Sequence, residues 1–80
     1  AQYKIAKKAL QDFVIEVQPV SNQVVVKTTT AAAQVIAESI DNLHLEGIVA
    51  SLAGDNVVLV ITADQKKAEL VAKSIDDYIE

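Results

Sequence analysis

The chain has 80 residues, of which 51% are hydrophobic, and a formal net charge of −4. This length fits one domain, and the lack of cysteine excludes disulfides and thiolate metal sites. All seven cationic residues are lysines, and only Lys4, Lys7 and Lys8 cluster, so this domain alone should bind DNA poorly.

A short helix or linker is predicted at the start of the chain, over residues 1–12. In "YKIAKKALQD", the apolar residues Ile5, Ala9 and Leu10 have near-helical spacing. The lysines between them are expected to lie on a solvated face. Because the chain begins with Ala1 rather than Met, we expect it to be a fragment with a segment removed upstream.

Two strands joined by a turn are predicted next. Alternating side chains in "FVIEVQPV", from Phe13, are typical of a strand, and Pro19 should end it or lie at a sheet edge. The Ser-Asn pair at 21–22 suits a turn. The segment "QVVVKTT", from Gln23, then reads as the second strand, so the pair forms a hairpin.

A helix follows in "TTAAAQVIAESIDNL". Its apolar residues recur at spacings of four, four and three from Ala32 to Leu43, which is one face of a helix. The hydroxyl of Thr29 or Thr30 is expected to cap its first turn.

A second hairpin and a second long helix complete the chain. The segments "IVASLA" and "VVLVIT" are predicted strands, and "GDN" between them is the predicted turn. Asp64 should then cap a last helix, whose apolar face includes Ala68, Val71 and Ile75.

The element order predicts a two-layer α+β domain over residues 13–80. The order is ββαββα, and two helices can cover one face of a four-stranded sheet. The central strands are apolar at successive positions, so both sheet faces are apolar. An uncovered apolar face of this size indicates oligomerisation through the sheet. The alternative is that an upstream region covers it.

Residues suited to catalysis are few, and we expect neither an enzyme nor a cofactor or metal site. His44 is the one histidine, interpreted as a helix-cap or surface residue, and no second histidine forms a metal pair with it. No serine lies in a nucleophile-elbow motif. The element order resembles that of the pterin carbinolamine dehydratases, but those enzymes use several histidines.

Polar residues on one helix face are more informative. Gln34 and Asp41 are seven residues apart, which places them nearly in line, with Glu38 between them. An ordinary solvated stripe is the simple explanation for these three, and a turn residue is the simple explanation for Asp55. A cationic ligand would change both explanations, because a guanidinium needs planar carboxylate acceptors.

The segment "EGIVASLAGDNVVLVI" resembles the strand-turn-strand signature of the arginine repressor family. The upstream segment "KALQDFVIEVQPVSNQVVVKTTTAAAQVIAESID" is similar to the C-terminal domain of that family. The resemblance covers residues 4–79.

The resemblance implies a cytoplasmic regulator of transcription with no membrane contact. Such repressors carry an N-terminal winged-helix domain that binds DNA, and residues 1–12 would then lead from that missing domain. The C-terminal domain forms trimers, and two trimers form a hexamer. L-arginine binds between the trimers and favours the DNA-binding assembly. A mixed hexamer with a sibling regulator is a further arrangement that the resemblance allows.

The resemblance also implies the ligand-binding residues. Gln34 and Asp41 match positions at the arginine pocket, Ala53 matches the small residue whose backbone contacts the ligand, and Asp55 matches the first aspartate of a pair that acts across the interface. The second aspartate is replaced by Asn56, which keeps an acceptor but loses a charge. The alternative function is therefore a structural assembly module whose arginine binding is weakened or lost.

Overall fold

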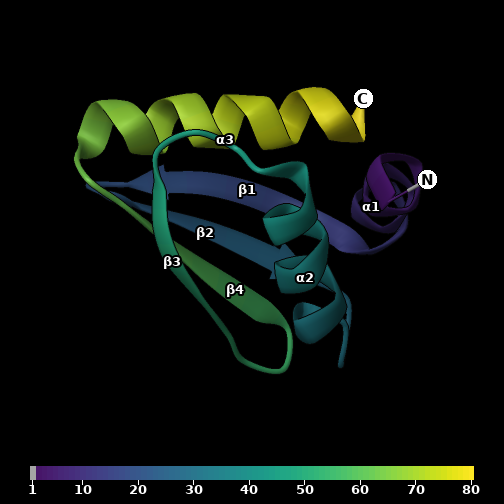
Figure 1. The fold of residues 1–80 in the computed structure, drawn as a ribbon. Helices are drawn as coiled ribbons and strands as arrows, with labels where there is room; N and C mark the ends of the chain where they lie inside the picture. Colours follow the sequence, from purple (N-terminus) through teal and green to yellow (C-terminus); the bar gives the residue numbers. More distant parts are fainter. Residues whose placement is uncertain (1) are drawn as a thin grey trace.

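Three helices and four strands make up the computed structural model, which describes residues 2–80 (Figure 1). In chain order the elements are α1 (Gln2–Phe13), β1 (Val14–Val20), β2 (Gln23–Thr28), α2 (Ala33–Leu43), β3 (Ile48–Ala53), β4 (Val57–Thr62) and α3 (Gln65–Ile79). The predicted α+β class is confirmed, and so is the ββαββα order from β1 onward.

The four strands form one antiparallel sheet in the order β1-β2-β4-β3. The two predicted hairpins supply the outer pairs, and β2 joins β4 in the centre. Val26 lies opposite Val17 of β1 on one side and Val58 of β4 on the other. Cross-strand neighbours share a face, so this row of valines points to one side of the sheet.

The core lies between this side of the sheet and the helices. Alternate residues of β2 and β4 point into it and are buried, while their neighbours are partly buried or, at Lys27, exposed. The largest fully buried side chains are Leu10, Val24, Val26, Ile36, Ile40, Val58, Val60, Val71 and Ile75. Burial of each such side chain stabilises the fold by about 1.5–3 kcal/mol.

The helix layer contains three helices, whereas the element order predicted two. Leu10 of α1 is 0% exposed, and Ala6 and Ala9 beside it are buried, so this segment is a packed helix rather than a linker. Phe13, expected at the start of the first strand, is instead the last residue of α1. Alanines contribute little to an apolar pattern, so the sequence did not predict that this helix packs into the core. The connection of α1 to an upstream DNA-binding domain stays a prediction.

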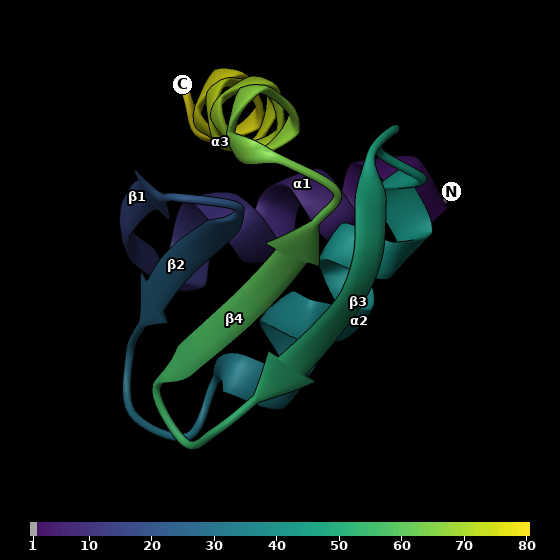
Figure 2. The same cartoon turned by 90° about the vertical axis from the view of Figure 1, so that its left-hand side faces the viewer.

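Within the described residues 2–80, the other side of the sheet carries no helix (Figure 2). Leu59 lies there, opposite Val25 on one side and Leu52 on the other, and Leu52 is 64% exposed. We call this surface the open face, and its apolar residues are Val20, Val25, Ala50, Leu52, Val57, Leu59 and Ile61. The polar residues of this face lie toward β1, where Lys27 Nζ is 3.7 Å from Glu16 Oε1. The open face is thus an apolar area bordered on one side by charge.

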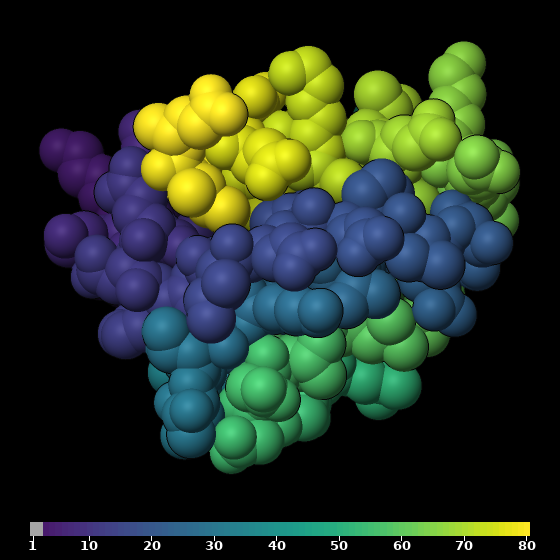
Figure 3. All heavy atoms as spheres, turned by 180° about the vertical axis from the view of Figure 1, so that it is seen from behind, coloured from purple at the N-terminus to yellow at the C-terminus, as the bar shows by residue number. Residues whose placement is uncertain are grey.

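The two edge strands of the sheet are irregular. β1 crosses the middle of the molecule in Figure 3, with α3 above it. Its pairing with β2 shifts between Val14 and Glu16, and it contains Pro19, which has no N–H to donate. The other edge, β3, has a similar shift between Ile48 and Ala50.

The two predicted helix caps have different outcomes. Asp64 caps α3 as expected, because its Oδ1 accepts a hydrogen bond from Lys67 N at 2.8 Å. The predicted capping of α2 by Thr29 or Thr30 is wrong. Ala32 occupies the N-cap position, and it has no side-chain oxygen that accepts a hydrogen bond.

The residue before this N-cap is under backbone strain. Ala31 has a φ of 66°, a left-handed conformation that costs a residue with a Cβ about 1–2 kcal/mol. Ala31→Gly should therefore raise the free energy of unfolding by about 0.5–1 kcal/mol, after allowance for the greater freedom of glycine in the unfolded chain. Urea denaturation measures the change. Ala37→Gly, inside α2, is the control and should lower stability by about 1 kcal/mol; lower stability in both variants would contradict the expectation.

Candidate functional site

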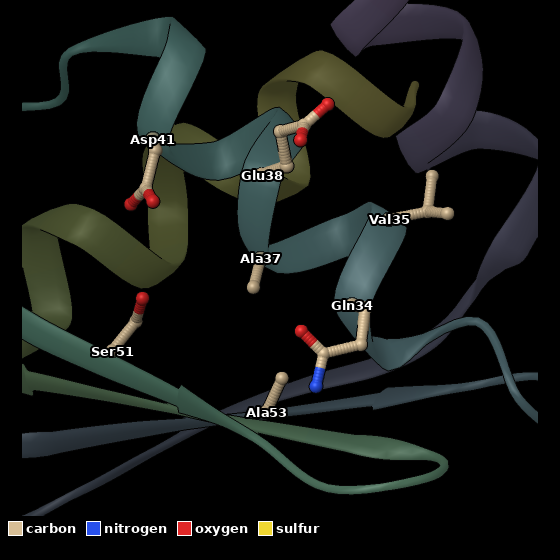
Figure 4. Close-up of a pocket in the computed structure, with 7 residues that line it drawn as sticks. All are labelled: Gln34, Val35, Ala37, Glu38, Asp41, Ser51 and Ala53. Carbon is tan, nitrogen blue, oxygen red and sulfur yellow. The ribbon is translucent and has the colours of Figure 1, made fainter.

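A groove of about 450 Å³ lies between α2 and β3 (Figure 4). The residues that line it come from these two elements only. They are Gln34, Val35, Ala37, Glu38, Asp41, Ser51 and Ala53.

Helix and strand periodicity explain which side chains reach the groove. On α2, Gln34, Glu38 and Asp41 follow spacings of four and three, while Ile36 and Ile40 turn into the core and are fully buried. On β3, Ser51 and Ala53 alternate with residues of the open face and are half-buried. Because these strand residues are small, space remains between strand and helix.

The groove has an acidic and polar lining. Glu38 and Asp41 contribute two carboxylates, and no lysine or histidine lines it. Figure 4 shows the Asp41 carboxylate on the side of Ser51 and the Gln34 amide beside Ala53. Within residues 2–80, the ion pairs are Lys8–Asp12, Lys27–Glu16 and Lys73–Asp77, so neither groove carboxylate has a cationic partner in the chain. The arrangement suits a cation that also accepts or donates hydrogen bonds.

Three of the five predicted ligand residues therefore lie together. Gln34, Asp41 and Ala53 line one groove, although they come from two elements. Asp55 and Asn56 do not line it in a single chain. They form the tip of the β3–β4 turn, where Gly54 N donates to Val57 O at 2.8 Å, and both are exposed.

The turn contacts the loop before α2 instead. Ala31 N donates to Asp55 Oδ2 at 3.4 Å, and Ala33 N donates to the Asp55 carbonyl at 3.2 Å. Thr28 N donates to the Asn56 carbonyl at 2.8 Å. Asp55 thus has a role inside its own chain that the sequence did not indicate.

The structure adds further residues to the groove. Glu38 was interpreted from the sequence as part of a solvated helix face. Ser51, Val35 and Ala37 were not predicted as site residues. The spacing of Glu38 from Gln34 and the alternation of Ser51 with Ala53 were the available signals.

A second cavity of about 360 Å³ lies between α1, α3 and the loop after α2. Tyr3 and Tyr78 meet there edge to face, with ring centroids 5.5 Å apart. The neighbouring Tyr3 side chain raises the pKa of Tyr78 above its usual value, with a smaller contribution from desolvation. The pair packs α1 against α3.

Residues 2–80 contain neither a cluster of metal-ligating side chains nor a membrane-spanning helix. No group of three histidine or carboxylate residues in this range is placed to hold a metal ion. None of the helices in the described range is long and apolar enough to cross a membrane.

Comparisons with known proteins identify the family to which the chain is similar. Residues 10–77 match the family model described as the arginine repressor, C-terminal domain. An arginine repressor of Clostridium novyi is 40% identical over 67 residues, which cover 84% of this chain and 44% of the relative. Those of Halothermothrix orenii and Acidobacterium capsulatum are 32% and 36% identical and cover 91% and 90% of this chain.

The chain spans about half the length of the curated relatives that it matches. These relatives are named as repressors, not as enzymes. The family match extends from α1 into α3 and includes every residue of the groove. This chain therefore belongs to the arginine repressor family and corresponds to its C-terminal domain.

Proposed function

We propose that this domain senses L-arginine and assembles a transcriptional regulator of arginine metabolism. The observation that carries the proposal is the groove, in which Gln34, Asp41 and Ala53 come together in a chain of this family. The relatives are named for arginine, and the lining has the charge that an arginine side chain requires.

The groove suits the cationic end of this ligand. A guanidinium donates pairs of parallel hydrogen bonds to a carboxylate, and Asp41 and Glu38 are two such acceptors without a cation beside them. The amide of Gln34 can accept or donate, and the backbone at Ala53 is close to the space. Asp55 would complete the site from another copy of the chain, because it lies outside the groove of its own.

Assembly through the open face is the second part of the proposal. The apolar rows around Leu59 are uncovered in one chain, and contact with other copies would remove them from water. The resemblance implies a trimer, and two trimers joined across the grooves would form a hexamer. DNA binding would belong to an upstream domain, since this chain is acidic and spans half of its relatives.

Titration calorimetry with L-arginine, L-lysine and L-citrulline tests the sensing role. We expect arginine to bind and citrulline, which lacks the charge, to bind at least tenfold more weakly. Asp41→Asn should weaken arginine binding by roughly tenfold or more, because it removes one charged acceptor. Asp76→Asn on α3 is the matched control and should leave the affinity for L-arginine unchanged. If L-arginine at millimolar concentration produces no heat of binding, the proposal is excluded.

Asn56 favours the alternative, an assembly module with weak or lost arginine binding. If the missing charge weakens the site, Asn56→Asp should tighten arginine binding by about three- to tenfold, roughly the effect of a charged hydrogen bond over a neutral one. Sedimentation with and without arginine separates the two functions. An assembly whose size does not respond to arginine supports the alternative.

A further inference from the structure

We propose that Asp55 is a positioning residue that holds the start of α2 and thereby places Gln34 in the groove. The inference concerns contacts inside one chain. Its consequence for arginine binding rests on the function proposed above, but its structural part does not.

The start of α2 lacks the local capping that most helices have. The first N–H groups of a helix have no acceptor within the helix and normally bond to the side chain of the N-cap residue. Ala32 has no such side chain, and neither preceding threonine replaces it. The first N–H of the helix, that of Ala33, instead donates to the carbonyl of Asp55 in the turn between β3 and β4.

Asp55 supplies one acceptor to α2 and one to the loop before it, since Ala31 precedes the N-cap residue. Its carbonyl accepts from Ala33 N at 3.2 Å, and its carboxylate Oδ2 accepts from Ala31 N at 3.4 Å. The second bond is long, but it acts on a residue whose left-handed backbone is already strained. A negative carboxylate at the N-terminus of a helix is also favoured by the helix dipole.

Gln34 is the second residue of α2 and follows this loop directly. The position of its side chain in the groove therefore depends on how firmly the loop is held. Asp55 has a second oxygen, Oδ1, with no partner among residues 2–80, so one carboxylate can hold its own loop and still face another copy. Asp55 would then contribute to two grooves. It would hold the loop that places Gln34 in the groove of its own chain, and its charge would contact the ligand in the groove of a neighbouring copy.

Amide hydrogen exchange of the arginine-free protein tests the positioning role. In Asp55→Ala, exchange at Ala31 should rise about three- to tenfold, because its side-chain acceptor is gone, and exchange at Ala33 should rise less, because the Asp55 carbonyl that accepts from it remains. In Asp55→Asn, exchange at both residues should stay within about twofold of wild type, because the amide oxygen still accepts. The NMR signals of the Gln34 side-chain amide should shift in the alanine variant and be restored in the asparagine variant.

Asn56→Ala is the matched control. It removes the neighbouring side chain of the same turn, but the carbonyl that Thr28 contacts remains. Exchange at Ala31 and Ala33 should not change. Equal exchange in wild type and Asp55→Ala, or an equal rise in Asn56→Ala, would overturn the inference.

The arginine titration is read separately. If the wild type fails to bind arginine, the proposed function fails while the exchange result stands. If Asp55→Asn keeps the loop but loses arginine binding, the charge acts on the ligand and the acceptor acts on the helix, as expected for a residue that serves two grooves.

Discussion

Leu10→Ala should lower the free energy of unfolding by about 3 kcal/mol, within the usual range for a leucine removed from a core. Leu10 is 0% exposed and belongs to the same apolar cluster as Ile36, Val71 and Ile75. The loss combines the transfer of the side chain to water with the cavity that remains. A change this large is a major part of the total stability of a domain of 80 residues.

Ile5→Ala on the same helix is the control, because Ile5 is 69% exposed. It should change stability by less than about 0.5 kcal/mol. Urea denaturation of both variants at one protein concentration gives the comparison. A loss below 1 kcal/mol in Leu10→Ala would mean that α1 does not share the core in solution.

Leu59→Asp should prevent assembly while the single chain stays folded. Leu59 lies at the centre of the open face, between Val25 and Leu52. In an assembly through this face, each copy would bury an unpaired carboxylate at a cost of several kcal/mol. We expect association to weaken at least 100-fold, which corresponds to about 2.8 kcal/mol.

Leu70→Asp provides the same change on another surface. Leu70 lies on α3 and is 54% exposed, away from the open face. Sedimentation velocity should show the wild type and Leu70→Asp as oligomers and Leu59→Asp as single chains. Circular dichroism verifies that all three are folded. An oligomeric Leu59→Asp protein would place the interface elsewhere.

Much of the fold was predictable because its elements have clear periods. The alternation in β2 and β4 and the three- and four-residue spacing in α2 and α3 each specify one buried face. The apolar character of the second sheet face was visible in the same way, since successive residues of a strand point to opposite sides. The packing of α1 could not be predicted from the sequence, because two of its core positions are alanines, Ala6 and Ala9.

The site was predictable in part. Helical spacing placed Gln34 and Asp41 on one helix face, and the family resemblance named them and Ala53 as ligand residues. The structure brings these three together in one groove, and their role in binding stays a prediction. The role of Asp55 at the start of α2 was not predictable, because it depends on contacts between segments 24 residues apart. The local capping rules predicted that Thr29 or Thr30 would cap α2. In the structure, Asp55 contacts the start of the helix from a distant turn instead.

The irregular edges of the sheet have a consequence for the form that association takes. A regular edge strand offers free N–H and C=O groups, and chains that add strand to strand can grow without limit into fibres. Here Pro19 and the pairing shift at Ile15 interrupt one edge, and the shift at Val49 interrupts the other. Strand addition is thereby disfavoured at both edges. In the assembly proposed above, copies would meet through their faces, where rotational symmetry would close the particle at a fixed number of subunits.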